Sequence, residues 1–254
     1  MSRPHDRLER LLVALLSVPA PPGGERRLSE MCARFFSRRG FHVDVDRAAN
    51  VFARRGAPGV LVCAHLDDLG HPSRRGVGMM DGALYSITGA PLGGDDKCGV
   101  AIAMYLACVP DLPLTVLLTT QEEVGSVGCR EFLAHSRDAL DGVMAALVLD
   151  RRGTCDVVVN ACGVEFDPQG EWTALVIDAG HEVGVPARAV TGMMSDAVVL
   201  AAEGIPVVNI SVGYRLPHTQ AEHVYVRDVH ASLCWALRAL RKTGSGVAAP
   251  RFWG

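Results

Sequence analysis

The sequence lacks a strong charge bias and lacks any long apolar run. Its 254 residues carry a formal net charge of −3, and Lys and Arg are scattered along the chain. A nucleic-acid-binding surface usually gathers such residues into a basic stripe, and no such stripe occurs here. No apolar run approaches the ~20 residues that a membrane-spanning helix requires. We therefore expect neither a nucleic acid nor a membrane as a partner.

The sequence also lacks paired cysteines and a clear secretory segment. None of the eight cysteines belongs to a C-x-x-C pair, and most lie in apolar stretches, which is typical of small buried hydrophobes in a reducing compartment. Residues 11–18 weakly resemble a secretory signal. Leucines at helical spacing over residues 6–17, ending before Pro19, favour an amphipathic helix instead. These patterns favour a cytoplasmic location.

No internal repeat or long linker divides the chain. Hydrophobic residues make up 49% and charged residues 21%, which allows a sizeable core. We expect one domain over residues 1–243. The Gly-, Ala- and Pro-rich tail, 244–254, is expected to be flexible.

Predicted strands alternate with predicted helices, and Val60 to Ala64 is a continuous apolar run typical of a strand buried on both faces. This alternation predicts an α/β fold, a three-layer α/β/α sandwich with a mostly parallel mixed sheet. Strands are expected at 41–45, 51–53, 60–64, 114–119, 143–149, 156–160, 187–190 and 206–211, with a hairpin around Asp81-Gly82. Helices are expected at 6–17, 25–39, 96–109, 128–136, 171–183, 196–203 and 227–242.

One stretch, Gly93 to Gly99, combines a flexible backbone with two carboxylates. Gly93 and Gly94 allow a tight turn, and Asp95 and Asp96 follow directly before a predicted helix. A carboxylate in this place serves either as a helix N-cap or as an oxygen ligand for one or two metal ions. The stretch taken alone favours the cap and leaves the ligand open.

Polar residues follow several predicted strands at the point where each strand ends. Ligands bind outside the carboxyl ends of strands in such sheets. Each residue taken singly is more often a loop residue or turn cap, but all of them fall on one predicted edge. Two histidines and several carboxylates suit two divalent cations such as zinc, manganese or cobalt. The residues are His65, Asp67, Asp68, Glu122, Glu123, Asp150 and His218, with Asp95 entering from the glycine loop.

The spacing of these residues fits metal-assisted hydrolysis. In His65-x-Asp67, the aspartate can accept a proton from the second nitrogen of a ligating imidazole and so fix its tautomer. Of the neighbours Glu122 and Glu123, one can bind a metal while the other works as a general base. Two metals ~3.5–4 Å apart need one bridging ligand, which a bidentate carboxylate provides.

Five motifs occur in a defined order along the chain. They are His65-x-Asp67, Gly94-Asp95-Asp96-Lys97-x-Gly99, Glu122-Glu123-x-Gly125, Asp150 and Pro217-His218-x-x-x-Glu222. Together they resemble the motifs of the co-catalytic dinuclear zinc exopeptidases, which include leucyl and glutamyl aminopeptidases and peptidase T. The resemblance extends from the Pro-rich loop at 19–24 to about Asp228.

The resemblance implies an aminopeptidase that removes N-terminal residues from short peptides with the help of two divalent metal ions. Zinc is the expected metal, with cobalt or manganese as alternatives. It implies that His65 and Asp150 bind one metal and that Glu123 and His218 bind the other. Asp95 would bridge both metals.

Further roles follow from the same resemblance. Asp67 would orient His65, and Glu122 would take a proton from a metal-bridging water and pass it to the leaving amine. The peptide bond between Asp95 and Asp96 would be cis.

The sequence departs from the larger members of this superfamily. Only 29 residues lie between His65 and Asp95, and 45 between Asp150 and Asp196, too few for the extra domain of glutamyl aminopeptidases or peptidase T. We therefore expect a minimal member that forms, at most, a small homo-oligomer.

Substrate contacts are less defined. Asp196 and Glu222 are candidates for holding the amino terminus of the peptide, and Tyr214 and Arg215 for contacting a substrate carbonyl or carboxylate. Asp196 is equally well explained as a helix cap, and Arg215 as an ordinary loop arginine. The pair at 151–152, Arg-Arg, either favours an acidic substrate or faces solvent.

Two other functions stay open at this stage. Related families use nearly the same site to hydrolyse N-acyl amino acids or carboxypeptidase-type substrates. An inactive metal-binding scaffold would keep the fold but lose a ligand or Glu122, and none of these residues is missing.

Overall fold

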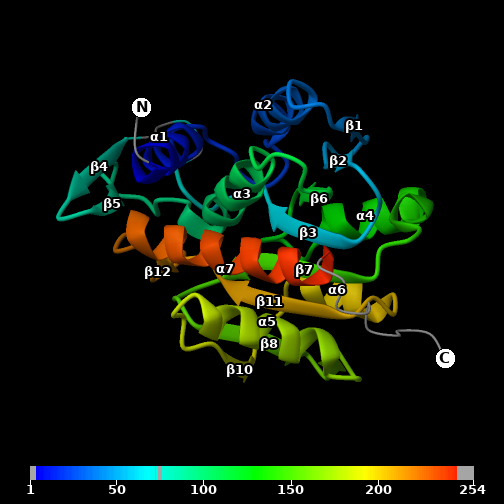
Figure 1. The fold of residues 1–254 in the computed structure, drawn as a ribbon. Helices are drawn as coiled ribbons and strands as arrows, with labels where there is room; N and C mark the ends of the chain where they lie inside the picture. Colours follow the sequence, from blue (N-terminus) through cyan, green and yellow to red (C-terminus); the bar gives the residue numbers. More distant parts are fainter. Residues whose placement is uncertain (1–3, 72, 74–75, 245–254) are drawn as a thin grey trace.

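The computed structural model describes residues 4–71, 73 and 76–244, and it is built around a nine-stranded mixed sheet (Figure 1). The strands are β1 (His42–Val45), β2 (Val51–Arg55), β3 (Val60–His65), β6 (Leu114–Thr119), β7 (Ala145–Arg151), β8 (Asp156–Ala161), β9 (Val164–Glu165), β10 (Arg188–Thr191) and β11 (Val207–Ser211). Their order is β1-β2-β6-β3-β7-β11-β8-β10, with β9 beside β8. The central strands β6, β3, β7 and β11 run parallel, so their carboxyl ends meet at one edge.

Helices cover both faces of this sheet, as expected when neighbouring residues of a buried strand point to opposite sides. Val60, Val62 and Ala64 of β3 pack into one apolar cluster, and Leu61 and Cys63 pack into the other. The first cluster includes side chains of α1 (Pro4–Leu16), α2 (Arg26–Ser37), α3 (Gly94–Leu106), α5 (Glu171–Glu182) and α7 (Val226–Gly244). The second includes α4 (Val127–Ser136), the short 3-10 helix η1 (Arg137–Leu140) and α6 (Asp196–Ala202). The predicted three-layer α/β/α architecture is thereby confirmed.

A second, four-stranded sheet lies beside the start of α3. It consists of β12 (Tyr214–Arg215), β13 (His223–Tyr225), β5 (Ala83–Ser86) and β4 (Val77–Met80), in that order. The β4–β5 hairpin turns at Asp81-Gly82, as predicted. The strands β9, β12 and β13 and the 3-10 helix η1 were not expected from the sequence, because two to four residues are too few to show a periodic pattern.

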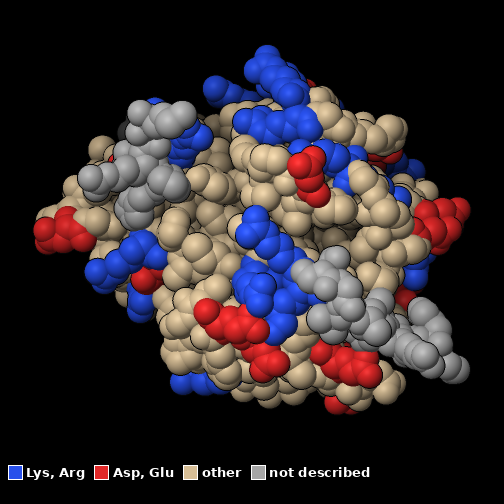
Figure 2. All heavy atoms as spheres, in the orientation of Figure 1, with Lys and Arg blue, Asp and Glu red and all other residues tan. Residues whose placement is uncertain are grey.

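Other differences from the expected elements are confined to their ends. The helix expected at 96–109 begins at Gly94, although the dihedral angles of Asp95 and Asp96 are not helical. The expected flexible tail lies, from residue 245 onward, outside the described residues. None of the described helices combines the length and apolarity needed to cross a membrane. Figure 2 shows side chains of both charge signs on one face of the molecule, in line with the small net charge.

Candidate metal centre and active site

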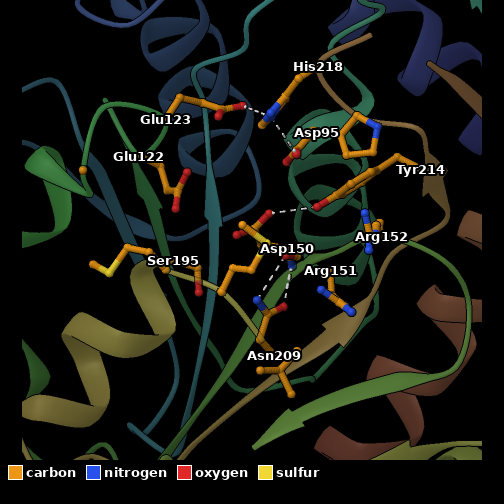
Figure 3. A pocket seen from close by; sticks show the side chains of 15 residues that line it. Asp95, Glu122, Glu123, Asp150, Arg151, Arg152, Ser195, Asn209, Tyr214 and His218 are labelled. Atoms are coloured by element: carbon orange, nitrogen blue, oxygen red, sulfur yellow. Dashed lines mark hydrogen bonds and ion pairs between the residues drawn. The ribbon is translucent and has the colours of Figure 1, made fainter. Parts of the chain in front are cut away.

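A cavity of about 420 Å³ lies at the carboxyl edge of the parallel strands (Figure 3). Its lining includes six residues that the sequence analysis singled out as site residues. His65 and Asp67 are almost fully buried beside it, at 1% and 0% exposure. The six lining residues are Asp95, Glu122, Glu123, Asp150, Tyr214 and His218.

Three side chains at this edge of the sheet form a largely buried group that we call the inner triad: His65, Asp95 and Asp150. His65 is the last residue of β3, and Asp150 lies near the end of the neighbouring β7. The His65 Nε2 atom lies 3.2 Å from Asp95 Oδ1 and 3.5 Å from Asp150 Oδ1. One nitrogen and two oxygen donors therefore converge on a space that suits a single cation.

A second group, the outer triad, consists of Asp95, Glu123 and His218. The His218 Nε2 atom lies 2.8 Å from Glu123 Oε1 and 3.2 Å from Asp95 Oδ2 (Figure 3). The two carboxylate oxygens of Asp95 thus point to different histidines, Oδ1 to His65 and Oδ2 to His218. This is the arrangement that a carboxylate bridging two ions requires.

The charge of the cluster also fits bound cations. Burial, and then the proximity of neighbouring carboxylates, raises the pKa of Asp150 to about 6 and of Glu123 to about 7. Burial raises the pKa of Glu122 to about 9, with added repulsion from Asp150. So many buried carboxylates resist ionisation unless positive charge neutralises them. Imidazole and carboxylate donors together suit zinc, manganese or cobalt.

The turn that carries Glu122 and Glu123 is held by two buried carboxylates. The Asp67 carboxylate accepts hydrogen bonds from the backbone N–H groups of Glu122 and Glu123, both at 3.0 Å. Glu25 accepts one from the N–H of Gln121 at 3.1 Å. Asp67 also contacts the ring of His65: its Oδ1 atom lies 3.4 Å from His65 Nδ1, and its carbonyl oxygen 3.0 Å from the same nitrogen.

The glycine loop is held in a similar way. The two oxygens of Glu222 accept hydrogen bonds from the N–H groups of Gly93 and Asp95, at 2.9 and 3.0 Å. Asp96 accepts one from the N–H of Gly99 at 3.0 Å, so the helix-cap role belongs to Asp96 rather than Asp95. The Asp95–Asp96 peptide bond is cis.

Lys97 and Asp68 form a fully buried ion pair that joins this loop to the segment after β3. A Cβ atom at Gly99 would lie 2.0 Å from the carbonyl oxygen of Leu149. Only glycine therefore allows α3 to approach β7 this closely.

Asp150 is fixed by Asn209 on the neighbouring strand β11. The Asn209 side chain accepts a hydrogen bond from the Asp150 N–H and donates one to the Asp150 carbonyl, both at 3.0 Å. The Tyr214 hydroxyl donates to Asp150 Oδ1 at 3.3 Å. Glu25 and Asn209 had no assigned role in the sequence analysis, because their contacts join residues 96 and 59 positions apart and no local pattern signals them.

Three of the tentative substrate contacts are not part of the cavity lining. The Arg215 guanidinium pairs with Asp228 at 2.8 Å. Glu222 is occupied by the glycine loop. Asp196 is 2% exposed and accepts a hydrogen bond from the hydroxyl of Thr119.

The chain is similar to several known peptidases. The family described as "Peptidase family M28" matches residues 50–232. The cytosol non-specific dipeptidase of Escherichia coli (strain K12) is 28% identical over 137 residues, which cover 46% of this chain and 28% of that protein. The match therefore spans less than a third of the relative's own length.

Two solved structures show the same fold. Aminopeptidase PepT from Bacillus cereus superposes with a TM-score of 0.85 at 16% identity, over 95% of this chain and 99% of that one. A tripeptidase from Staphylococcus aureus superposes with a TM-score of 0.81 at 15% identity, over 94% and 98%.

The family match covers well over half of the chain, and the described site contains donor groups that could hold metal ions. The chain belongs to peptidase family M28.

Proposed function

We propose that this protein is an aminopeptidase that uses two divalent cations, with zinc as the first candidate, to remove N-terminal residues from short peptides. The observation that carries the proposal is the shared Asp95, whose Oδ1 faces His65 while its Oδ2 faces His218. Two donor triads that share one carboxylate support two bound ions rather than one.

Each residue has a defined part in holding the ions. His65 and Asp150 would hold one cation, Glu123 and His218 the other, and Asp95 both. Bound divalent ions polarise a scissile carbonyl and lower the pKa of water. Asp67 orients His65 and also positions the Glu122–Glu123 turn.

Glu122 is the proposed general base. Its carboxylate lines the cavity, and its Oε2 atom lies 3.8 Å from His65 Nε2, yet it belongs to neither triad. A buried carboxylate is a stronger proton acceptor than an exposed one, since burial raises its pKa. Glu122 takes the proton that the attacking water loses and gives it to the amine that leaves as the C–N bond breaks.

The acidic cavity favours peptides with a free amino terminus as substrates over N-acyl amino acids. A free peptide amino terminus carries a positive charge and can donate hydrogen bonds to the carboxylate oxygens of the lining that the bound cations leave unoccupied. An N-acyl amino acid carries no such charge. Its hydrolysis remains the second candidate, because the cavity lining also contains Arg151 and Arg152, which could meet its carboxylate.

We also infer a cytoplasmic location and, at most, a small homo-oligomer. The location is supported by the free cysteines among the described residues and by the name of the E. coli relative, a cytosol dipeptidase. Neither inference affects the assignment of the site.

The test is the variant Glu122→Gln. The control is Glu171→Gln on α5, which makes the same change of charge at an exposed residue. Elemental analysis should find two divalent ions per chain in both variants. Hydrolysis of amino-acid 4-nitroanilides should fall about 10²- to 10⁴-fold in Glu122→Gln alone. Full retained activity would refute the base assignment, and cleavage of N-acyl amino acids in preference to 4-nitroanilides would favour the second candidate.

A further inference from the structure

The cavity lining contains two arginines that the metal centre does not use, Arg151 and Arg152. Arg152 follows directly after β7, is exposed, and lines the same cavity as the two triads (Figure 3). Its guanidinium makes no hydrogen bond or ion pair with any residue that the structure describes. The neighbouring Arg151 differs, because its guanidinium pairs with Asp156 at 3.1 Å.

The backbone that presents Arg152 is firmly anchored. The Ser211 hydroxyl donates a hydrogen bond to the Arg152 carbonyl at 2.8 Å. The Val212 N–H donates to the Arg151 carbonyl at 2.8 Å, and the Gly153 N–H donates to the Tyr214 carbonyl at 2.9 Å. These bonds tie the segment to the loop after β11. The Arg152 side chain therefore starts from a fixed point, which lowers the entropy lost when it binds a ligand.

The charges of the cavity are consequently of two kinds. The triads and Glu122 supply carboxylate oxygens, which bind cations or accept hydrogen bonds from the ammonium end of a peptide. Arg152 supplies an uncompensated guanidinium, whose planar donors match a carboxylate in a bidentate pair. A short peptide carries both complementary groups, and about 420 Å³ is within the range of small-molecule sites.

We propose that Arg152 binds a carboxylate of the substrate and so selects peptides that carry one close to the cleaved bond. The carboxylate comes either from the C-terminus of a di- or tripeptide or from an acidic side chain. This inference rests on the proposed peptidase function, which it makes more specific. Arg152 is then a specificity-determining residue and takes no part in the proton transfer.

The experiment compares kcat/KM on three substrates, the dipeptide Leu-Gly, its amide Leu-Gly-NH2, and Leu-Glu-NH2. The zinc-loaded protein should favour a carboxylate-bearing peptide over Leu-Gly-NH2 by about 10- to 100-fold, mainly through KM. A preference for Leu-Gly identifies the C-terminus as the source, and one for Leu-Glu-NH2 identifies the acidic side chain. Arg152→Gln should remove most of the preference, and Arg152→Lys should restore part of it, because lysine keeps the charge but not the fork of donors.

Arg38→Gln is the matched control, since Arg38 is an exposed arginine at the end of α2 that lines a different cavity. It should keep the wild-type preference. If Arg152→Gln hydrolyses peptides and its ratio of kcat/KM for the carboxylate-bearing peptide to kcat/KM for Leu-Gly-NH2 is unchanged, the inference is overturned. The proposed function would then stay intact.

A binding measurement tests the role of Arg152 even if the proposed peptidase function is wrong. Calorimetric titration of zinc-loaded Glu122→Gln with Leu-Gly, Leu-Gly-NH2 and Leu-Glu-NH2 should show the same preference, and adding Arg152→Gln should abolish it. If the protein hydrolyses none of these peptides yet binds the acid forms through Arg152, the proposed function fails and the role of Arg152 stands. Equal affinities with and without Arg152→Gln would overturn that role directly.

Discussion

The inner and outer triads offer similar donors but are built in different ways. His65 and Asp150 of the inner triad lie at the ends of β3 and β7, which pair directly in the sheet, and their side chains are 1% and 9% exposed. Glu123 and His218 of the outer triad lie in loops. The His218 side chain is 44% exposed, and its backbone has a positive φ of 63°.

If each triad holds one ion, as proposed, this difference predicts that the two ions bind with unequal affinity. Sheet hydrogen bonds fix the inner donors before any ion arrives, so little conformational freedom is lost on binding. An exposed loop histidine has more conformational freedom than a strand residue, and the loss of that freedom opposes binding. We therefore expect the inner ion to bind more tightly than the outer one.

The largest loss of metal binding and activity is expected from replacing Asp95, which both triads share. Asp95→Ala removes a donor from both, so elemental analysis should find almost no bound metal, and peptidase activity should fall at least about 10⁴-fold. Asp178→Ala, an exposed position on α5, serves as control. Two bound ions in Asp95→Ala would contradict the bridging role. A mere helix cap would lose only about 1 kcal/mol of stability, and that bond is made by Asp96.

A smaller effect, restricted to the inner triad, is expected from Asn209→Ala. This change removes both hydrogen bonds that hold the Asp150 backbone. Affinity for the inner ion should fall about 10- to 100-fold, as for other partners that orient metal ligands. Competitive titration with a chelator measures both affinities, and the outer ion provides the internal reference. An equal loss at both positions would show that the triads do not respond separately.

The two affinities of the unmodified protein should differ by about tenfold, which corresponds to about 1.4 kcal/mol. Graded chelation should remove the outer ion first. The matched variants Asp150→Asn and His218→Asn assign the order, because the first should keep only the weaker ion and the second only the tighter one. The comparison would be reversed if His218→Asn lost its remaining ion at the lower chelator concentration.

The smallest effect concerns the pH dependence of the metal-free protein. Burial raises the pKa of Glu122 to about 9, and the Asp95 carboxylate raises the pKa of His218 to about 9. Both values exceed those of the unfolded chain, so the folded state binds more protons and loses stability as pH rises toward 9. Asp67 does not alter this window, because its pKa is lowered and it titrates in acid.

Thermal unfolding in a chelator should therefore show a melting temperature that falls by roughly 5 °C between pH 6.5 and pH 9. Zinc should diminish the fall, since the cations replace the protons. A metal-free melting temperature that stays level or rises over this range would contradict the expected sign.

Much of the candidate site could be predicted because its residues stand at strand ends. His65 and Asp150 follow apolar runs, and parallel strands bring their carboxyl ends to one edge. The positioning roles were harder to predict. Glu222 has a carboxylate that suits a substrate amino group, yet the structure uses it to hold the glycine loop. Arg215 is likewise turned to Asp228.

The sequence by itself determined the alternation of strands and helices, the edge where polar groups collect, and the residue types that suit a metal. These properties depend on neighbours in the chain, on apolar periodicity and on the end of each strand. The residues of the glycine loop taken alone left the roles of Asp95 and Asp96 open, and the tertiary structure directs Asp95 to both His65 and His218 while Asp96 caps α3. It also decided that Arg151 is paired while Arg152 lines the cavity without a partner among the described residues. Adjacent residues of the same type differ in role because their side chains leave the backbone in different directions and meet partners far away in sequence.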